Sequence, residues 1–193
     1  MEAAAALFVE QGYERTSMSA ISERVGGSKA TLYGYFDSKE ALLRAVLAYS
    51  VQEEAEALLA EFPDNEALRT GLIRLGEHYL FDRLAPLPIT NTRILSTQPE
   101  EAGLGALFYA ETLDPAWHSF AKRIEALMDK GRLRRADPWV AAMHWKGLNE
   151  GELLEKRLLG AITEIDPVKV RRVATDAADA FLRIYAPEAE ASG

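Results

Sequence analysis

Apolar residues recur at three- and four-residue spacing along most of this chain, while alternation of β-branched residues is nearly absent. Three- and four-residue spacing places side chains on one face of an α-helix. Glycine and proline separate the apolar stripes, and no Asn-Gly or Asp-Gly pair marks a hairpin. The sequence therefore predicts an all-α fold of about nine helices.

The first fifty residues predict three short helices and the start of a longer one. Their stripes begin at Ala4, Met18 and Ala41, and the last runs on to Leu58 and Leu59. Thr16 or Ser17 stands where the second helix needs a cap, and Ser28 stands where the third needs one. Two short helices joined by a glycine-containing turn are typical of a helix-turn-helix.

The stretch "SKATLYGYF" at residues 28–36 would be the second helix of that motif. In a helix-turn-helix this helix enters the DNA major groove, and its first residues touch base edges. Leu32 and Phe36 share one face and are expected to dock on Ile21 and Val25. The polar and small residues face outward. A small three-helix core with surface tyrosines explains the pattern equally well.

The later helices are longer, and Asp-Pro pairs mark several of their starts. Aspartate is a good cap, and proline is favoured at the first helical position. The break "APLPITN" follows Leu84, and 89–96 is expected to be a short helix or irregular. The other predicted helices are 65–84 with Asn65 as cap, 100–130 with a new start or kink at Asp114-Pro115, 137–159 and 166–185.

The composition excludes several classes of protein. Hydrophobic residues make up 48% and charged residues 27% of the 193 positions, which is ordinary for a soluble domain. The absence of cysteine excludes disulfides and predicts a reducing, cytoplasmic location. No apolar run reaches the roughly 20 residues of a membrane helix, and the start lacks the features of a signal peptide. No membrane partner is expected.

The charge neither supports nor excludes DNA as a partner. The net charge of -8 argues against phosphate neutralisation, which needs Lys and Arg. Basic residues do gather near the predicted motif, but acidic residues dilute them. The basic set is Arg15, Arg24, Lys29, Lys39 and Arg44, and the acidic set is Glu10, Glu14, Glu23, Asp37 and Glu40.

Several fixed spacings in residues 3–47 together resemble the N-terminal domain of TetR-family transcriptional regulators. They are "LF-x-x-x-GY", Thr16-Ser17, the glycine turn, "SKATLYGYF" and "SKEALL". The resemblance implies a homodimer that binds a pseudo-palindromic, double-stranded operator and a small-molecule effector that usually releases the DNA. It divides the chain into a DNA-binding head at 1–45, an effector and dimerisation domain at 46–187, and a frayed tail at 188–193.

The resemblance also implies which residues contact DNA. Ala30, Thr31 and Gly34 would face bases, although a glycine at 34 offers no side chain for readout. Thr16, Ser17, Tyr33 and Lys39 would contact phosphates, which position the head without reading sequence. The full predicted set is Thr16, Ser17, Ser28, Lys29, Ala30, Thr31, Tyr33, Gly34, Tyr35 and Lys39.

The last two long helices are expected to form the dimer interface. The segment "DPWVAAMHWKGLNEGELLEKRLLG" resembles a C-terminal subgroup of the same family. Small residues on a helix let a second helix approach closely. The predicted interface consists of Val140, Met143, Gly147, Leu148, Gly151, Leu154, Val170, Val173, Ala174, Ala177, Ala178 and Phe181. An intramolecular core is the alternative for each stripe.

Aromatic and isolated polar residues on the central helices are the candidates for an effector pocket, because such pockets are mostly apolar with a few polar groups. They are His78, Phe81, Asn91, Arg93, Phe108, Trp117, Phe120, Trp145 and Asn149. Trp117 and Phe120 also suit a core. Arg93 suits an anionic ligand or an ion pair with Glu100 or Glu101.

No enzymatic motif is present. His78, His118 and His144 share no metal-ligand spacing, and "GLGALF" lacks the third glycine and the preceding strand of a dinucleotide site. No catalytic residue, metal or cofactor is expected. The sequence predicts a ligand-responsive regulator that acts as a repressor. The alternative is a helical small-molecule-binding or interaction protein with weak or lost DNA binding.

Overall fold

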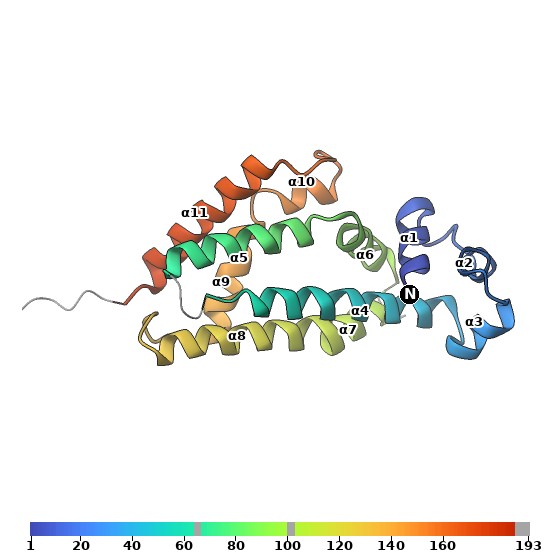
Figure 1. The fold of residues 1–193 in the computed structure, drawn as a ribbon, viewed down its shortest axis with the longest axis horizontal. Coiled ribbons are helices and arrows are strands. Elements are labelled where there is room, and N and C mark those ends of the chain that lie inside the picture. Colours follow the sequence, from blue (N-terminus) through green and yellow to red (C-terminus); the bar gives the residue numbers. More distant parts are fainter. Residues whose placement is uncertain (64–66, 100–102, 188–193) are drawn as a thin grey trace, which may run out of the picture. The chain divides into compact units, whose positions relative to one another are not determined.

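The computed structural model describes residues 1–63, 67–99 and 103–187, and these ranges are helical without strands (Figure 1). Nine of the helices have seven residues or more, so the predicted all-α class is confirmed. None of the described helices combines the length and the apolar character needed to cross a bilayer. The chain forms two compact units, Met1–Glu53 with Pro86–Leu113, and Glu54–Ala85 with the chain from Asp114 onward.

The first unit contains the predicted helix-turn-helix. A cluster of buried apolar side chains, including Leu7, Phe8, Ile21, Leu42 and Leu43, forms its core. Its helices are α1 (Glu2–Gln11), α2 (Met18–Val25), α3 (Lys29–Tyr35), the first part of α4 (Lys39–Ala60), α6 (Pro86–Thr97) and α7 (Leu104–Phe108), with a π-helical segment at Tyr109–Leu113.

Serine side chains begin the helices of the motif. Ser17 Oγ accepts from the Ala20 N–H at 3.1 Å, and Ser28 Oγ accepts from the Thr31 N–H at 3.0 Å. Such bonds satisfy backbone donors that the first helical turn leaves open. The predicted caps Ser17 and Ser28 are confirmed.

Val25 does not dock where the sequence predicted. Ile21 is buried, and Leu32 and Phe36 are half-buried against the same core. Val25 is 64% exposed. It is the last residue of α2, directly before Gly26, whose φ of 72° ends the helix in the left-handed region. The expected contact of Val25 with the next helix is therefore wrong.

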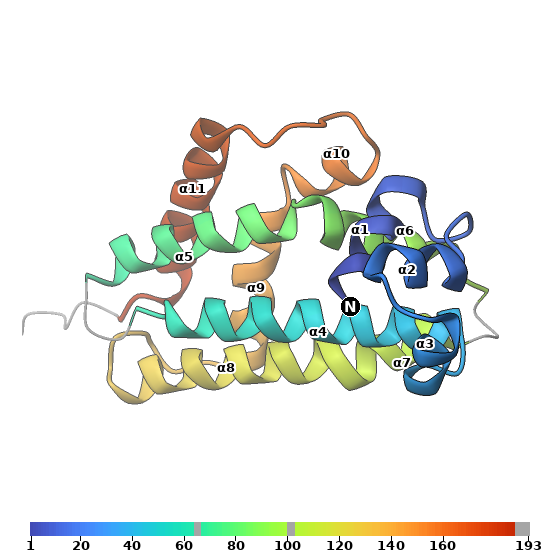
Figure 2. The same cartoon turned by 45° about the vertical axis from the view of Figure 1, so that its right-hand side comes forward.

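The second unit is a helical bundle in which α5 packs against α11 and α8 packs against α9 (Figure 2). Its larger core is built around the aromatic residues Tyr79, Phe120 and Trp145, and a smaller one surrounds Leu84, Leu153 and Val170. Its helices are the end of α4, α5 (Leu68–Arg83), α8 (Asp114–Asp129), α9 (Pro138–Glu150), α10 (Leu154–Leu158) and α11 (Pro167–Tyr185).

Both Asp-Pro helix starts in the last third of the chain are confirmed. Asp137 Oδ1 accepts from the N–H groups of Trp139 and Val140 at 2.8 and 3.1 Å. Asp166 Oδ1 accepts from the Val168 N–H at 2.9 Å. The predicted helix 137–159 is instead two helices, because the chain turns after Glu150 and buries Leu153 in the smaller core.

The middle of the chain differs from the prediction in its boundaries. Helix α6 begins at Pro86 and is longer than the expected 89–96, because prolines are tolerated in a first helical turn. Helix α5 begins after Ala67, which has no side-chain acceptor. At Asp114 the α-helix resumes directly after the π-helical segment Tyr109–Leu113, so the chain is helical without a break there. The predicted cap Asn65, the acidic pair Glu100 and Glu101, and the tail 188–193 lie outside the described residues.

Candidate nucleic-acid interface and effector domain

Helix α3 presents an outward face that the rest of its unit does not cover. Each of its residues is exposed or half-buried, and only Leu32 turns toward the core. Tyr35 is 80% exposed and Tyr33 is 43% exposed. Two exposed tyrosines on a seven-residue helix form an aromatic surface that is open to a partner.

Short-range contacts organise the start of this face. The hydroxyls of Ser28 and Thr31 lie 2.8 Å apart, so the Thr31 side chain is oriented at the first turn. The Lys29 ammonium lies 5.9 Å from the centroid of the Tyr33 ring, within cation–π range. A Cβ built on Gly34 meets open space among the described residues, so the bare backbone there is accessible.

The two predicted residues at the start of α2 have different surroundings. Ser17 is exposed. Thr16 is only 2% exposed, and its Oγ1 donates to the Gly12 carbonyl at 2.8 Å and lies 3.3 Å from the Leu7 carbonyl. A phosphate contact from the Thr16 hydroxyl would have to replace its bond to Gly12, whereas Ser17 is open to a partner.

Lys39 is half-buried at the start of α4. Its ammonium donates to the carbonyls of Tyr13 and Glu14, at 3.0 and 3.4 Å, and lies 4.2 Å from the centroid of the Tyr13 ring. Nearby, Arg24 forms two hydrogen bonds with Glu10, and these lower the pKa of that carboxyl. Of the predicted lysines, Lys29 is therefore the exposed one.

The apolar stripe of α11 is core and not interface. All six of its predicted interface residues are buried within the chain itself, against α5 and α9. The alternative of an intramolecular core therefore holds for Val170, Val173, Ala174, Ala177, Ala178 and Phe181. Small residues let α11 approach α5 closely. A Cβ added to Gly76 of α5 would lie only 3.1 Å from the Cβ of Ala174 on α11.

The six predicted interface residues from α9 to the start of α10 remain at least partly accessible. Val140, Gly147 and Gly151 are exposed. Met143, Leu148 and Leu154 are half-buried. His144 lies on the same exposed face as Val140, and its Nδ1 is 2.7 Å from the hydroxyl of Tyr185. This face is the part of the predicted interface that a second copy can reach.

Three predicted effector residues form one aromatic cluster in the second unit. The ring centroid of Phe120 lies 4.7 Å from that of Trp145 and 5.5 Å from that of Trp117. The Tyr79 ring packs against both tryptophans. Trp145 Nε1 and Asn149 Oδ1 are buried and have no hydrogen-bond partner among the described residues. The cluster is thus a packed core that contains one unused donor and one unused acceptor.

A buried carboxylate that the sequence did not single out lies beside this cluster. Glu150 accepts from the Tyr79 hydroxyl at 2.5 Å, pairs with Lys146, and lies 3.4 Å from Arg83 Nε. Burial, followed by the Glu150 charge, raises the pKa of Tyr79 well above its usual value. The i, i+4 pair Lys146 and Glu150 in an apolar helix was the available signal.

The remaining effector candidates are dispersed. His78 bridges Glu61 and Asp82 at 3.2 and 2.9 Å, and Phe81 is 39% exposed. In the first unit Asn91 is buried, Phe108 packs against the core, and Arg93 is exposed. The proposed partners of Arg93, Glu100 and Glu101, lie outside the described residues.

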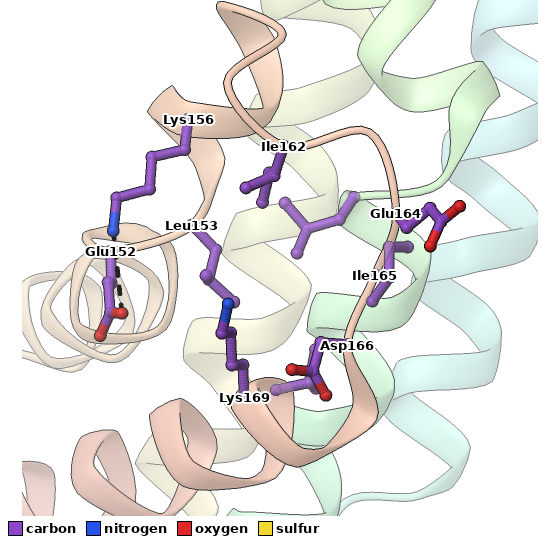
Figure 3. Close-up of a pocket in the computed structure, with 10 residues that line it drawn as sticks. Glu152, Leu153, Lys156, Ile162, Glu164, Ile165, Asp166 and Lys169 are labelled. Carbon is purple, nitrogen blue, oxygen red and sulfur yellow. Dashed lines mark ion pairs between the residues drawn. The ribbon is translucent and has the colours of Figure 1, made fainter.

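A cavity of about 110 Å³ lies between α10 and the start of α11 (Figure 3). Its floor is apolar, with Leu153 and Ile162, and its rim carries charged groups such as Lys156, which pairs with Glu152 at 3.8 Å. None of the nine predicted effector residues lines it. Among the described residues no group of His, Asp or Glu is arranged to hold a metal ion.

The chain is similar to known regulators in sequence. Residues 1–46 match the model of bacterial regulatory proteins of the tetR family, and residues 70–187 match the AefR-like transcriptional repressor C-terminal domain. The negative regulator IcaR of the biofilm operon icaADBC of Staphylococcus epidermidis is 33% identical over 39% of this chain and 40% of its own length. The curated relatives are matched over only 27% to 40% of their lengths.

Solved structures extend the similarity to nearly the whole chain. The flavonoid-responsive regulator FrrA is 30% identical over 97% of this chain and 95% of its own, with a TM-score of 0.68. A structure from Mesorhizobium loti MAFF303099 has a TM-score of 0.88 at 23% identity, over 96% and 94% of the two chains, and shows the shared fold. The α3 face, the matched domains and these structures agree: the chain belongs to the TetR family of DNA-binding transcriptional regulators, which are not enzymes.

Proposed function

We propose that this protein is a ligand-responsive repressor that binds a pseudo-palindromic operator as a homodimer. The observation that supports DNA binding most strongly is the exposed face of α3, where two tyrosines stand beside small residues. Its relative IcaR is named a negative regulator, which favours repression over activation.

The proposed DNA contacts fall into two groups. Ala30, Thr31 and the bare backbone at Gly34 read base edges, because small residues let a helix approach the floor of the major groove. Ser17, Lys29 and Tyr33 contact phosphates and position the head. Tyr35, at the far end of the exposed face, contacts the groove wall. Local geometry thus allows DNA binding despite the overall net charge of -8.

The exposed face of α9 is the proposed dimer contact. Val140, His144 and Gly147 lie on it at three- and four-residue spacing and are accessible to a second copy. Two heads held by such a contact would occupy two half-sites of opposite orientation, which is why the operator is expected to be symmetric.

The proposed effector is a small aromatic molecule that binds at the cluster around Trp145. The unused donor Trp145 Nε1 and acceptor Asn149 Oδ1 carry a desolvation cost that a ligand with matching polar groups would relieve. The related FrrA is named for its response to flavonoids, which are aromatic. Binding requires the core to open, so the ligand competes with the packed arrangement of Tyr79, Trp117 and Phe120.

Salt-dependent DNA binding tests the repressor proposal. The wild-type protein first selects duplexes from a random-sequence pool, and affinities for the enriched duplex and for a shuffled one are then measured by fluorescence anisotropy. Lys29→Ala is expected to weaken both affinities and to lower the salt slope by about 0.9 per head, because one phosphate contact is lost. Thr31→Ala should weaken binding to the enriched duplex alone, by about 1–3 kcal/mol, with an unchanged slope.

Lys122→Ala on α8 is the matched control, since it removes an exposed lysine in the second unit and should leave both affinities unchanged. The proposal fails if the wild type enriches no sequence, or if Lys29→Ala and Lys122→Ala behave alike. Aromatic compounds that raise the melting temperature and also release the enriched duplex would identify the effector class.

A further inference from the structure

The charged group of Lys39 points into the head and not away from it. Its Nζ donates to the carbonyls of Tyr13 and Glu14, and it lies against the face of the buried Tyr13 ring. Two of the three ammonium donors are thereby used inside the protein. Lys29 differs, since it is exposed and its recorded contact is the more distant one with the Tyr33 ring.

The charge of Lys39 is also partly compensated by its neighbour. Glu40 follows it on α4, and the pKa of Glu40 is lowered, first by hydrogen bonds from its own backbone and from Ser38, and further by the Lys39 charge. The Lys39 ammonium therefore has its nearest partners inside the head, and a phosphate would have to compete with them.

The contact joins the two ends of the helix-turn-helix. Tyr13 and Glu14 lie in the turn before α2, and Lys39 is the first residue of α4, the next helix after α3. The bond to Tyr13 spans 26 positions in the sequence, and the segment it closes contains both helices of the motif. The Tyr13 carbonyl also accepts from the Thr16 N–H at 3.2 Å, so one carbonyl links Lys39 to the residue before Ser17.

We propose that Lys39 is a positioning residue of the DNA-binding head, and that it does not act by neutralising a phosphate. By fastening the turn before α2 to the start of α4, it sets the distance between Ser17 and the outward face of α3. Both surfaces must meet the same duplex at once. The proposal rests on the proposed DNA-binding function, and it assigns Lys39 a role different from the one its family resemblance implies.

The two roles give different salt dependence, which three variants of the full chain can separate. Lys39→Met keeps the length of the side chain and removes its donors, Lys39→Gln removes the charge and keeps an N–H donor, and Lys29→Met is the comparator. Affinities for the enriched and shuffled duplexes are measured between about 50 and 200 mM salt.

A positioning role predicts that Lys39→Met weakens binding to the enriched duplex about tenfold, with little change for the shuffled duplex and an unchanged salt slope. Lys39→Gln should recover part of the loss, because its amide can donate to one carbonyl. Lys29→Met should lower the slope by about 0.9 per head. Equal losses of slope for Lys39→Met, Lys39→Gln and Lys29→Met would overturn the proposal.

Hydrogen exchange of the DNA-free protein gives a second readout, which a phosphate contact cannot affect. The Thr16 amide and its neighbours should exchange faster in Lys39→Met than in the wild type, and Lys29→Met should leave them unchanged. Unchanged exchange in Lys39→Met would reject the tie. If the wild type selects no duplex, the repressor proposal fails, and the exchange comparison still decides whether Lys39 fastens the motif.

Discussion

Gly34 and Gly76 both lie inside helices, but only at Gly76 do neighbouring residues leave no room for a larger side chain. A Cβ on Gly76 would lie 2.6 Å from Asn149 Oδ1 and 3.1 Å from Ala174 Cβ. A Cβ on Gly34 would meet open space. Gly76 is therefore required for the packing of α5, whereas no described residue of the chain requires a glycine at 34.

Gly76→Ala is expected to lower the free energy of unfolding by about 1–2 kcal/mol. Alanine gains up to about 1 kcal/mol in helix propensity, but overpacking of a filled core costs about 1–3 kcal/mol. Asn149 cannot easily move away, because it is buried and its Nδ2 donates to the Trp145 carbonyl at 2.9 Å. Chemical denaturation followed by circular dichroism measures the change.

Gly34→Ala is the control for that substitution. It adds the same methyl group to a helix without a clash, so it should leave stability unchanged or raise it by up to about 1 kcal/mol. A stabilised Gly76→Ala variant would mean that α5 and α9 are not packed as described.

At the scale of the helices, features that depend on neighbouring residues could be predicted from the sequence, whereas features that depend on tertiary packing could not. The starts at Asp137 and Asp166 were predictable, because a cap bonds only to its own first turn. The turn after Glu150 was not, because it depends on the burial of Leu153 between other helices. The α11 stripe has the same pattern whether its partner is another helix of the chain or a second copy, so the sequence left both possibilities open.

In the candidate site, too, the local pattern of α3 could be predicted from the sequence, whereas contacts between distant segments could not. The outward face of α3 follows from the spacing of Leu32 and Phe36 and from the family resemblance. The burial of Thr16 and the inward bonds of Lys39 depend on the turn at residues 12–14, which is distant in sequence from Lys39. The hydrogen bond that the buried Glu150 accepts likewise comes from another helix, from the hydroxyl of Tyr79.

The caps of the last helices give a stability prediction at the same scale. Asp137→Ala is expected to lower the free energy of unfolding by about 0.5–2 kcal/mol, because two backbone N–H groups lose their acceptor. Asp137→Asn keeps an acceptor and should cost only a few tenths of a kcal/mol. Thermal unfolding of the two variants measures the difference, and equal losses would contradict the capping role.

At the scale of the whole molecule, α4 contributes residues to the cores of both units. Its first half contributes Leu42, Leu43 and Leu47 to the first unit, and Leu58 belongs to the core of the second. The helix begins at Lys39, which fastens the DNA-binding motif.

Hydrogen exchange of the full chain with and without its selected duplex tests the central claim most directly, because it reports where on the protein DNA binds. Binding through the outward face of α3 predicts slower exchange at residues 17–20 and 28–36, with the exposed face of α9 unchanged. Protection confined to other surfaces, or no protection at 28–36 at a DNA concentration that saturates binding, would contradict the assignment of α3 as the DNA-reading helix.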